Sequence, residues 1–120
     1  MVKFFLLSRI GWPFAVDQPV NIARLARVLD VAFELLEVRS SEWGLQPVHY
    51  RDRKPSGSIE ALEKELTVVF DAMLGEEGKR KQANAENLRD EMARAWLVGG
   101  AARNEFEQFL DFWIKVKDEV

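Results

Sequence analysis

Asp17 and Gln18 are two adjacent polar side chains whose place in the sequence suits them to ligand binding. They directly follow the apolar run WPFAV at residues 12–16, and a helical pattern starts immediately after them. Polar groups between a strand and a helix lie in the crevice at strand carboxyl ends, where open α/β sheets bind ligands. A carboxylate accepts hydrogen bonds there, and an amide both donates and accepts them. The pair therefore predicts a site for a polar ligand.

Other polar residues have simpler interpretations. Asp17 itself is also a suitable helix N-cap, and capping and ligand binding can coexist at one carboxylate. We interpret His49, the single histidine, as a surface residue of a polar loop. Residues 51–53, Arg-Asp-Arg, are interpreted as a solvated charge cluster, and residues 79–81, Lys-Arg-Lys, as a solvated helix face rather than a phosphate site.

Composition limits the class of protein. The 120 residues correspond to one domain or a part of one, and the net charge of −3 gives no sign of a nucleic-acid partner. The absence of cysteine excludes disulfides, thiolate metal sites and cysteine nucleophiles. The apolar start is cut by Ser8 and Arg9 too early for a signal peptide, and no segment is long enough to span a bilayer. We therefore expect no cofactor, no metal, no transmembrane segment and a cytoplasmic location.

The first third of the chain predicts a strand, a helix and a second strand. Residues 2–7 are a short apolar run typical of a strand buried in a parallel sheet, and residues 10–16 continue it with bends. Pro19 suits the first turn of an amphipathic helix. Residues 31–38, VAFELLEV, fit a strand or a helix, and we favour a short strand for part of them.

The rest of the chain predicts a loop and three helices. Residues 39–57 are rich in Ser, Gly, Pro and charge and predict a surface loop, with a minor strand at residues 48–50. The first helix follows Ser58, a good N-cap, and ends at Gly75. The second runs from about Glu76 or Glu77 to Val98, and the third starts near Arg103 with a stripe of aromatic residues.

These elements define one partial domain. Residues 1–38 form its strand-helix-strand part, residues 39–57 its loop and residues 58–117 its three-helix segment. The prediction is an α/β fragment, mostly helical, with one or two short parallel strands and about four helices. A doubly wound sheet needs more strands than this sequence supplies.

Two stretches carry a family resemblance. Residues 12–39 have the sequence WPFAVDQPVNIARLARVLDVAFELLEVR, and residues 75–112 have the sequence GEEGKRKQANAENLRDEMARAWLVGGAARNEFEQFLDF. In order and spacing they resemble the C-terminal part of family-one UDP-dependent glycosyltransferases, most closely fungal members. The first stretch resembles the end of the sugar-donor box, which closes with an Asp-Gln or Glu-Gln pair. The second resembles the closing helical segment of the family.

The resemblance implies a GT-B architecture, in which two Rossmann-like domains hold a nucleotide sugar between them. It implies that this chain is the C-terminal portion of the second domain, truncated within the donor box. Asp17 would then bind sugar hydroxyls and Gln18 adjacent ones, which agrees with the ability of a carboxylate to accept two strong hydrogen bonds from vicinal hydroxyls. The family's uracil-binding and diphosphate-binding segments and its catalytic His and Asp have no counterpart here. We assign no catalytic residue, and His49 does not receive that role.

Two functions of different kinds follow. The first is a fragment of a UDP-sugar-dependent glycosyltransferase that transfers a hexosyl group to an acceptor hydroxyl. Such a fragment would be inactive alone and would bind UDP-sugar only when the missing domain completes the site. The alternative is a non-enzymatic helical interaction module, or the partner subunit of a split glycosyltransferase. Its aromatic stripe would bind another polypeptide or a second copy of the chain.

Overall fold

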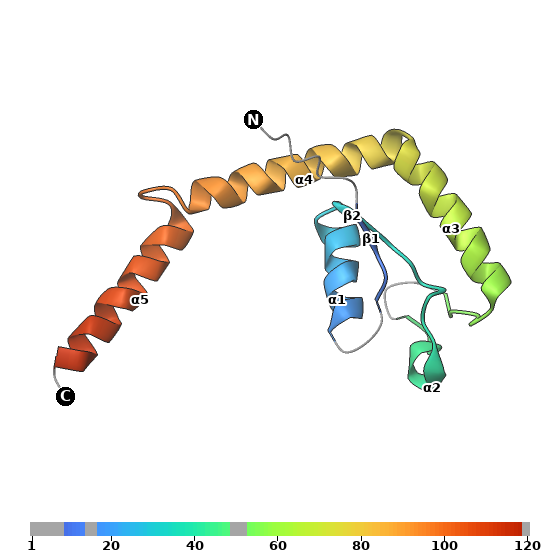
Figure 1. Ribbon diagram of the computed structural model, residues 1–120, viewed down its shortest axis with the longest axis horizontal. Helices are drawn as coiled ribbons and strands as arrows, with labels where there is room; N and C mark the ends of the chain where they lie inside the picture. Colours follow the sequence, from blue (N-terminus) through green and yellow to red (C-terminus); the bar gives the residue numbers. More distant parts are fainter. Residues whose placement is uncertain (1–8, 14–16, 49–52, 119–120) are drawn as a thin grey trace. The chain divides into compact units, whose positions relative to one another are not determined.

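The computed structural model describes residues 9–13, 17–48 and 53–118, and the chain divides into two compact units, Met1–Ala85 and Glu86–Val120. Figure 1 labels the elements in chain order. They are β1 (Arg9–Gly11), α1 (Gln18–Ala23), the π-helical turn η1 (Arg24–Val28), β2 (Ala32–Glu34), α2 (Ser41–Gly44), α3 (Ile59–Leu74), α4 (Glu76–Ala95) and α5 (Ala101–Asp118). The described residues thus form an α/β fragment that is mostly helical, as predicted.

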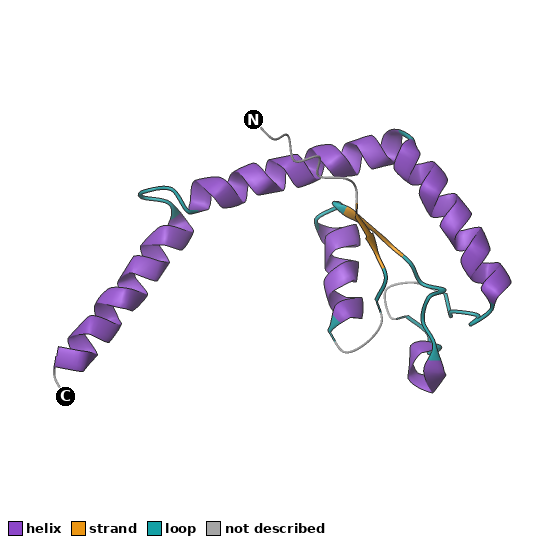
Figure 2. Ribbon diagram, viewed as in Figure 1, coloured by secondary structure: helices purple, strands orange, loops and turns teal. Residues whose placement is uncertain are grey.

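The strand-helix-strand part of the first unit forms a small parallel sheet. Strand β1 pairs with β2 in parallel, with Gly11 opposite Glu34, and α1 lies beside the strands (Figure 2). The approach is close because Gly11 has no side chain: a Cβ atom there would lie 1.9 Å from Cδ1 of Ile22. The buried core gathers around β2 and includes Phe33 and Leu36. The short strand expected within residues 31–38 is therefore confirmed, as is the helix after Asp17.

Some expected elements fall elsewhere or outside the described residues. The predicted strand at residues 2–7 lies outside them, and so do two of the three residues of the minor strand at 48–50. Strand β1 instead forms at Arg9–Gly11, partly within the stretch that was expected to bend. The loop at 39–57 contains α2, which the sequence did not predict because four residues are too few for helical periodicity to register.

Helix α3 begins and ends where its caps predict. The Ser58 hydroxyl accepts a hydrogen bond from the N–H of Ala61 at 3.2 Å, and the helix ends at Gly75. Helix α4 begins at Glu76 as expected but ends at Ala95, earlier than the predicted Val98. A turn follows, in which Gly99 adopts the left-handed region with φ 80°.

The second unit consists of the end of α4, this turn and α5. Trp96 and Phe106 contact each other edge to face across the turn, with ring centroids 6.1 Å apart. The large apolar side chains of α5 are all partly exposed. None of the helices in the described ranges combines the length and the hydropathy needed to cross a lipid bilayer.

Candidate functional site

Asp17 and Gln18 lie on the exposed surface at the start of α1. The carbonyl of Asp17 accepts the N–H of Asn21 at 3.0 Å, so the residue occupies the N-cap position. Its carboxylate makes no capping bond to the backbone and instead accepts the side-chain amide of Asn21 on Oδ2 at 2.9 Å. Side-chain capping is therefore not the role of Asp17. The carboxylate is presented to solvent and is oriented by Asn21, one helical turn along.

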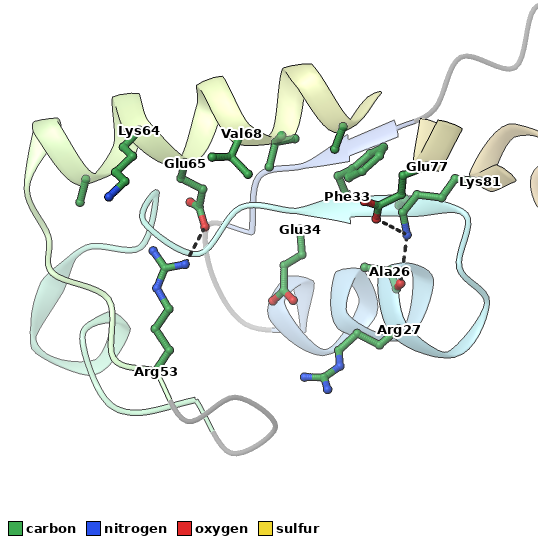
Figure 3. A pocket seen from close by; sticks show the side chains of 14 residues that line it. Ala26, Arg27, Phe33, Glu34, Arg53, Lys64, Glu65, Val68, Glu77 and Lys81 are labelled. Carbon is green, nitrogen blue, oxygen red and sulfur yellow. Dashed lines mark hydrogen bonds and ion pairs between the residues drawn. The ribbon is translucent and has the colours of Figure 1, made fainter. Parts of the chain in front are cut away.

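A separate cavity of about 620 Å³ lies elsewhere in the first unit (Figure 3). Asp17 and Gln18, the residues predicted from the sequence, lie outside it. Its described lining comes from η1, β2, α3, the start of α4 and one loop residue: Ala26, Arg27, Ala32, Phe33, Glu34, Arg53, Ala61, Lys64, Glu65, Val68, Val69, Ala72, Glu77 and Lys81. The cavity is therefore lined by both cationic and carboxylate side chains.

Glu65 binds the backbone at the end of β2. The side chain is buried and points from α3 toward the chain after β2, as Figure 3 shows. Both carboxylate oxygens accept the N–H of Leu36, at 3.0 and 2.9 Å, and Oε2 also accepts the N–H of Glu37 at 2.7 Å. Nη1 of Arg53 lies 3.8 Å from Oε1. The burial of this charge is offset by these charge-assisted hydrogen bonds.

Glu37 holds Arg53 and the loop before α3. Its Oε1 accepts Nη2 of Arg53 at 2.5 Å, and its Oε2 accepts both the N–H and the hydroxyl of Ser56, at 2.8 and 3.0 Å. Burial alone would raise the pKa of Glu37, but the hydrogen bonds from Ser56 and Arg53 outweigh it and hold the pKa below its usual value. Arg53 thus belongs to an ion-pair network, although residues 51–53 were interpreted as a solvated cluster.

Asp30 forms a second network with the start of α4. Its Oδ1 accepts Nζ of Lys81 at 2.5 Å, and its Oδ2 accepts Nε of Arg80 at 2.9 Å and the amide of Asn84 at 3.0 Å. Hydrogen bonds from Arg80 and then Lys81 lower the pKa of Asp30 from 3.8 to about 2. Lys81 is only 4% exposed, and its Nζ lies 5.0 Å from the ring centroid of Phe33. The interpretation of residues 79–81 as a solvated face was therefore wrong for Lys81.

One feature of the sequence indicates that Glu65 is buried and has a partner. Ala61, Val68 and Ala72 lie on the same face of α3, so Glu65 is a lone charge on a strip of small and apolar residues. Such a residue needs a buried partner. The identity of that partner was not foreseeable, because the N–H groups of Leu36 and Glu37 become available only through the turn after β2.

Three further residues considered in the sequence lie outside the described residues: His49, Arg51 and Asp52. Within the described part of the chain, no group of three or more His, Cys, Asp or Glu side chains is arranged to hold a metal ion.

Comparison with known proteins finds a relative named as a UDP-glycosyltransferase. The chain matches no family model, and no solved structure matches it significantly. It is 33% identical over 105 residues to the UDP-glycosyltransferase eriJ of Hericium erinaceus, and the alignment covers 86% of this chain and 21% of that protein. The chain thus spans about a fifth of the length of the curated relative that it matches. This finding supports a glycosyltransferase fragment rather than an unrelated helical module. The sequence is similar to a segment of a UDP-glycosyltransferase, in agreement with the resemblance of its two motifs.

Proposed function

We propose that this chain is the C-terminal segment of the donor-binding domain of a UDP-sugar-dependent glycosyltransferase with a GT-B fold. The observation that carries the proposal is the 33% identity to a protein named as a UDP-glycosyltransferase. The exposure of the Asp17 and Gln18 side chains at the start of α1 adds support, because a ligand can reach both. The full enzyme would bind UDP-sugar in a cleft to which this segment contributes one wall.

In this proposal Asp17 and Gln18 bind the sugar rather than perform the chemistry. The carboxylate of Asp17 accepts hydrogen bonds from two neighbouring hydroxyls, and the amide of Gln18 donates to or accepts from a third. A base outside this chain takes the proton of the acceptor hydroxyl. The acceptor oxygen then bonds to the anomeric carbon while the bond to the diphosphate breaks and UDP leaves. Asn21 acts as a positioning residue for Asp17, since it donates to Oδ2.

A chimera tests the proposal directly. The aligned segment of the Hericium erinaceus glycosyltransferase is replaced by the 105 residues of this chain that align with it, and donor-dependent transfer is measured. We expect the chimera to be active and the isolated chain to be inactive, since its sequence matches neither the family's catalytic base nor its uridine-binding segment. Asp17→Ala should lower kcat/KM for the donor by about 100-fold, the loss expected for charge-assisted hydrogen bonds.

The matched control is Asp71→Ala, which removes an exposed carboxylate from α3 and should leave transfer unchanged. Turnover by the isolated chain that Asp17→Ala abolishes would contradict the expected inactivity. A folded, inactive chimera would contradict the assignment to the donor-binding domain.

A further inference from the structure

The backbone after β2 offers a binding site for a carboxylate. The N–H groups of the successive residues Leu36 and Glu37 point at one place, and the guanidinium of Arg53 stands beside it. Consecutive peptide N–H groups next to a guanidinium are a common way for proteins to bind anions. In this chain the anion is internal, because the carboxylate of Glu65 occupies the place.

The site opens on the cavity. Glu65 and Arg53 are both part of the cavity lining, and so are Val68 and Ala72 from the same face of α3. About 620 Å³ of space therefore lies beside the carboxylate. A displaced Glu65 side chain would uncover the two N–H groups toward this space, where a small ligand has room to bind.

We propose that the N–H groups of Leu36 and Glu37, with Arg53, form a carboxylate-binding site that Glu65 occupies and that a small carboxylate ligand in the cavity fills when Glu65 is withdrawn. Glu65 is a tethered competitor, so its effective concentration at the N–H groups is high and an external carboxylate binds only when Glu65 is removed or withdrawn. The planar geometry of a carboxylate matches two neighbouring N–H donors, as the bonds to Glu65 demonstrate.

The charges around the site favour a ligand that carries a single negative charge. Arg53 is shared with Glu37, whose Oε1 accepts Nη2 at 2.5 Å. Glu37 also stays ionised, because the hydrogen bonds that Ser56 donates stabilise its carboxylate form. A monoanionic carboxylate replaces the charge of Glu65 one for one, whereas a dianion would add to the repulsion by Glu37. Monocarboxylates are therefore the class of ligand that fits.

Sodium formate is the probe, added to the Glu65→Ala variant of the full chain at constant ionic strength with chloride. The N–H resonances of Leu36 and Glu37 should shift with saturation, with a Kd no tighter than about 1 mM, the limit that three heavy atoms allow. The thermal midpoint of the variant should rise over the same concentrations, since a ligand that binds only the folded chain stabilises it. If the variant alone does not fold, formate should restore its far-ultraviolet circular dichroism.

Three controls decide the outcome. The wild-type chain and Glu63→Ala, which removes an exposed carboxylate from the same helix, should not respond to formate. Glu65→Ala combined with Arg53→Ala should respond at least tenfold more weakly. The proposal is overturned if formate neither shifts the two N–H resonances nor restores folding, if Glu63→Ala responds equally, or if inorganic phosphate binds more tightly than formate.

Discussion

The charge of Asp30 joins the turn before β2 to the start of α4. The residue adopts the left-handed region at φ 51°, which aspartate tolerates better than most residues, and there its carboxylate meets Arg80, Lys81 and Asn84. Because its pKa is lowered in the folded chain, the unfolded chain binds the proton more tightly. The stabilisation is therefore complete above the unfolded pKa of 3.8 and is lost as the pH falls to about 2.

Asp30→Asn should lower the free energy of unfolding at neutral pH by about 1–2 kcal/mol, since solvent screens the partly exposed pairs and Lys81 loses a buried partner. Chemical denaturation measured from neutral pH down to about pH 2 tests this. The difference between wild type and variant should shrink as the pH falls through this window, because protonation removes the same charge. A difference that stays constant with pH would show that the charge of Asp30 is not responsible.

Among single residues, the exposed polar side chains were easier to predict from the sequence than the buried ones. The exposed positions of Asp17 and Gln18 followed from the boundary between an apolar run and a helix. The burial of Lys81 did not, because it depends on Asp30, which lies far away in the sequence and turns toward α4 only through its left-handed backbone. Partners so distant leave no local pattern.

Gly78 determines how closely α4 follows α3. A Cβ atom at Gly78 would lie 1.8 Å from the carbonyl oxygen of Met73, so any side chain forces the backbone to move. Gly→Ala inside a helix normally stabilises it through propensity. Here the clash should reverse the sign, and Gly78→Ala should lower the free energy of unfolding by about 2 kcal/mol.

Gly44→Ala is the matched control, because the nearest side-chain or backbone atoms to a Cβ there lie at 3.5 Å or more, in ordinary contact. Its free energy of unfolding should equal or exceed that of the wild type in the same denaturation experiment. Equal stabilities of Gly78→Ala and Gly44→Ala would indicate that α3 and α4 meet with more freedom than the close contact implies.

Among the elements, those with local signals were predictable. Ser58 and Gly75 delimit α3 because capping chemistry acts within a few residues. The parallel pairing of β1 with β2 was harder to place, since a ladder of three residues depends on the close packing of Gly11 against Ile22 rather than on strand propensity. The one-turn helix α2 gave no periodic signal at all.

Over the whole molecule, the two units differ in how well they cover their apolar side chains. The buried core residues belong to the first unit, whereas Phe106, Phe109, Leu110, Phe112, Trp113 and Ile114 of α5 are between 42% and 62% exposed. Such a continuous apolar surface promotes association in water. We therefore expect the isolated chain to self-associate through α5, with a sedimentation coefficient that rises with concentration.

Phe109→Lys should weaken this association, because it places a charge at the centre of the apolar face between Phe106 and Trp113. The helix itself should be retained, since lysine has a good helix propensity. Gln108→Lys is the matched control: it adds the same charge at a neighbouring position, about 100° around the helix from Phe109, and should leave association unchanged. Sedimentation velocity over a tenfold or greater range of concentration distinguishes the wild type from the two variants.

If wild type, Phe109→Lys and Gln108→Lys all sediment as the same monomer, α5 does not mediate association. If both lysine variants dissociate equally, net charge rather than the aromatic face controls it.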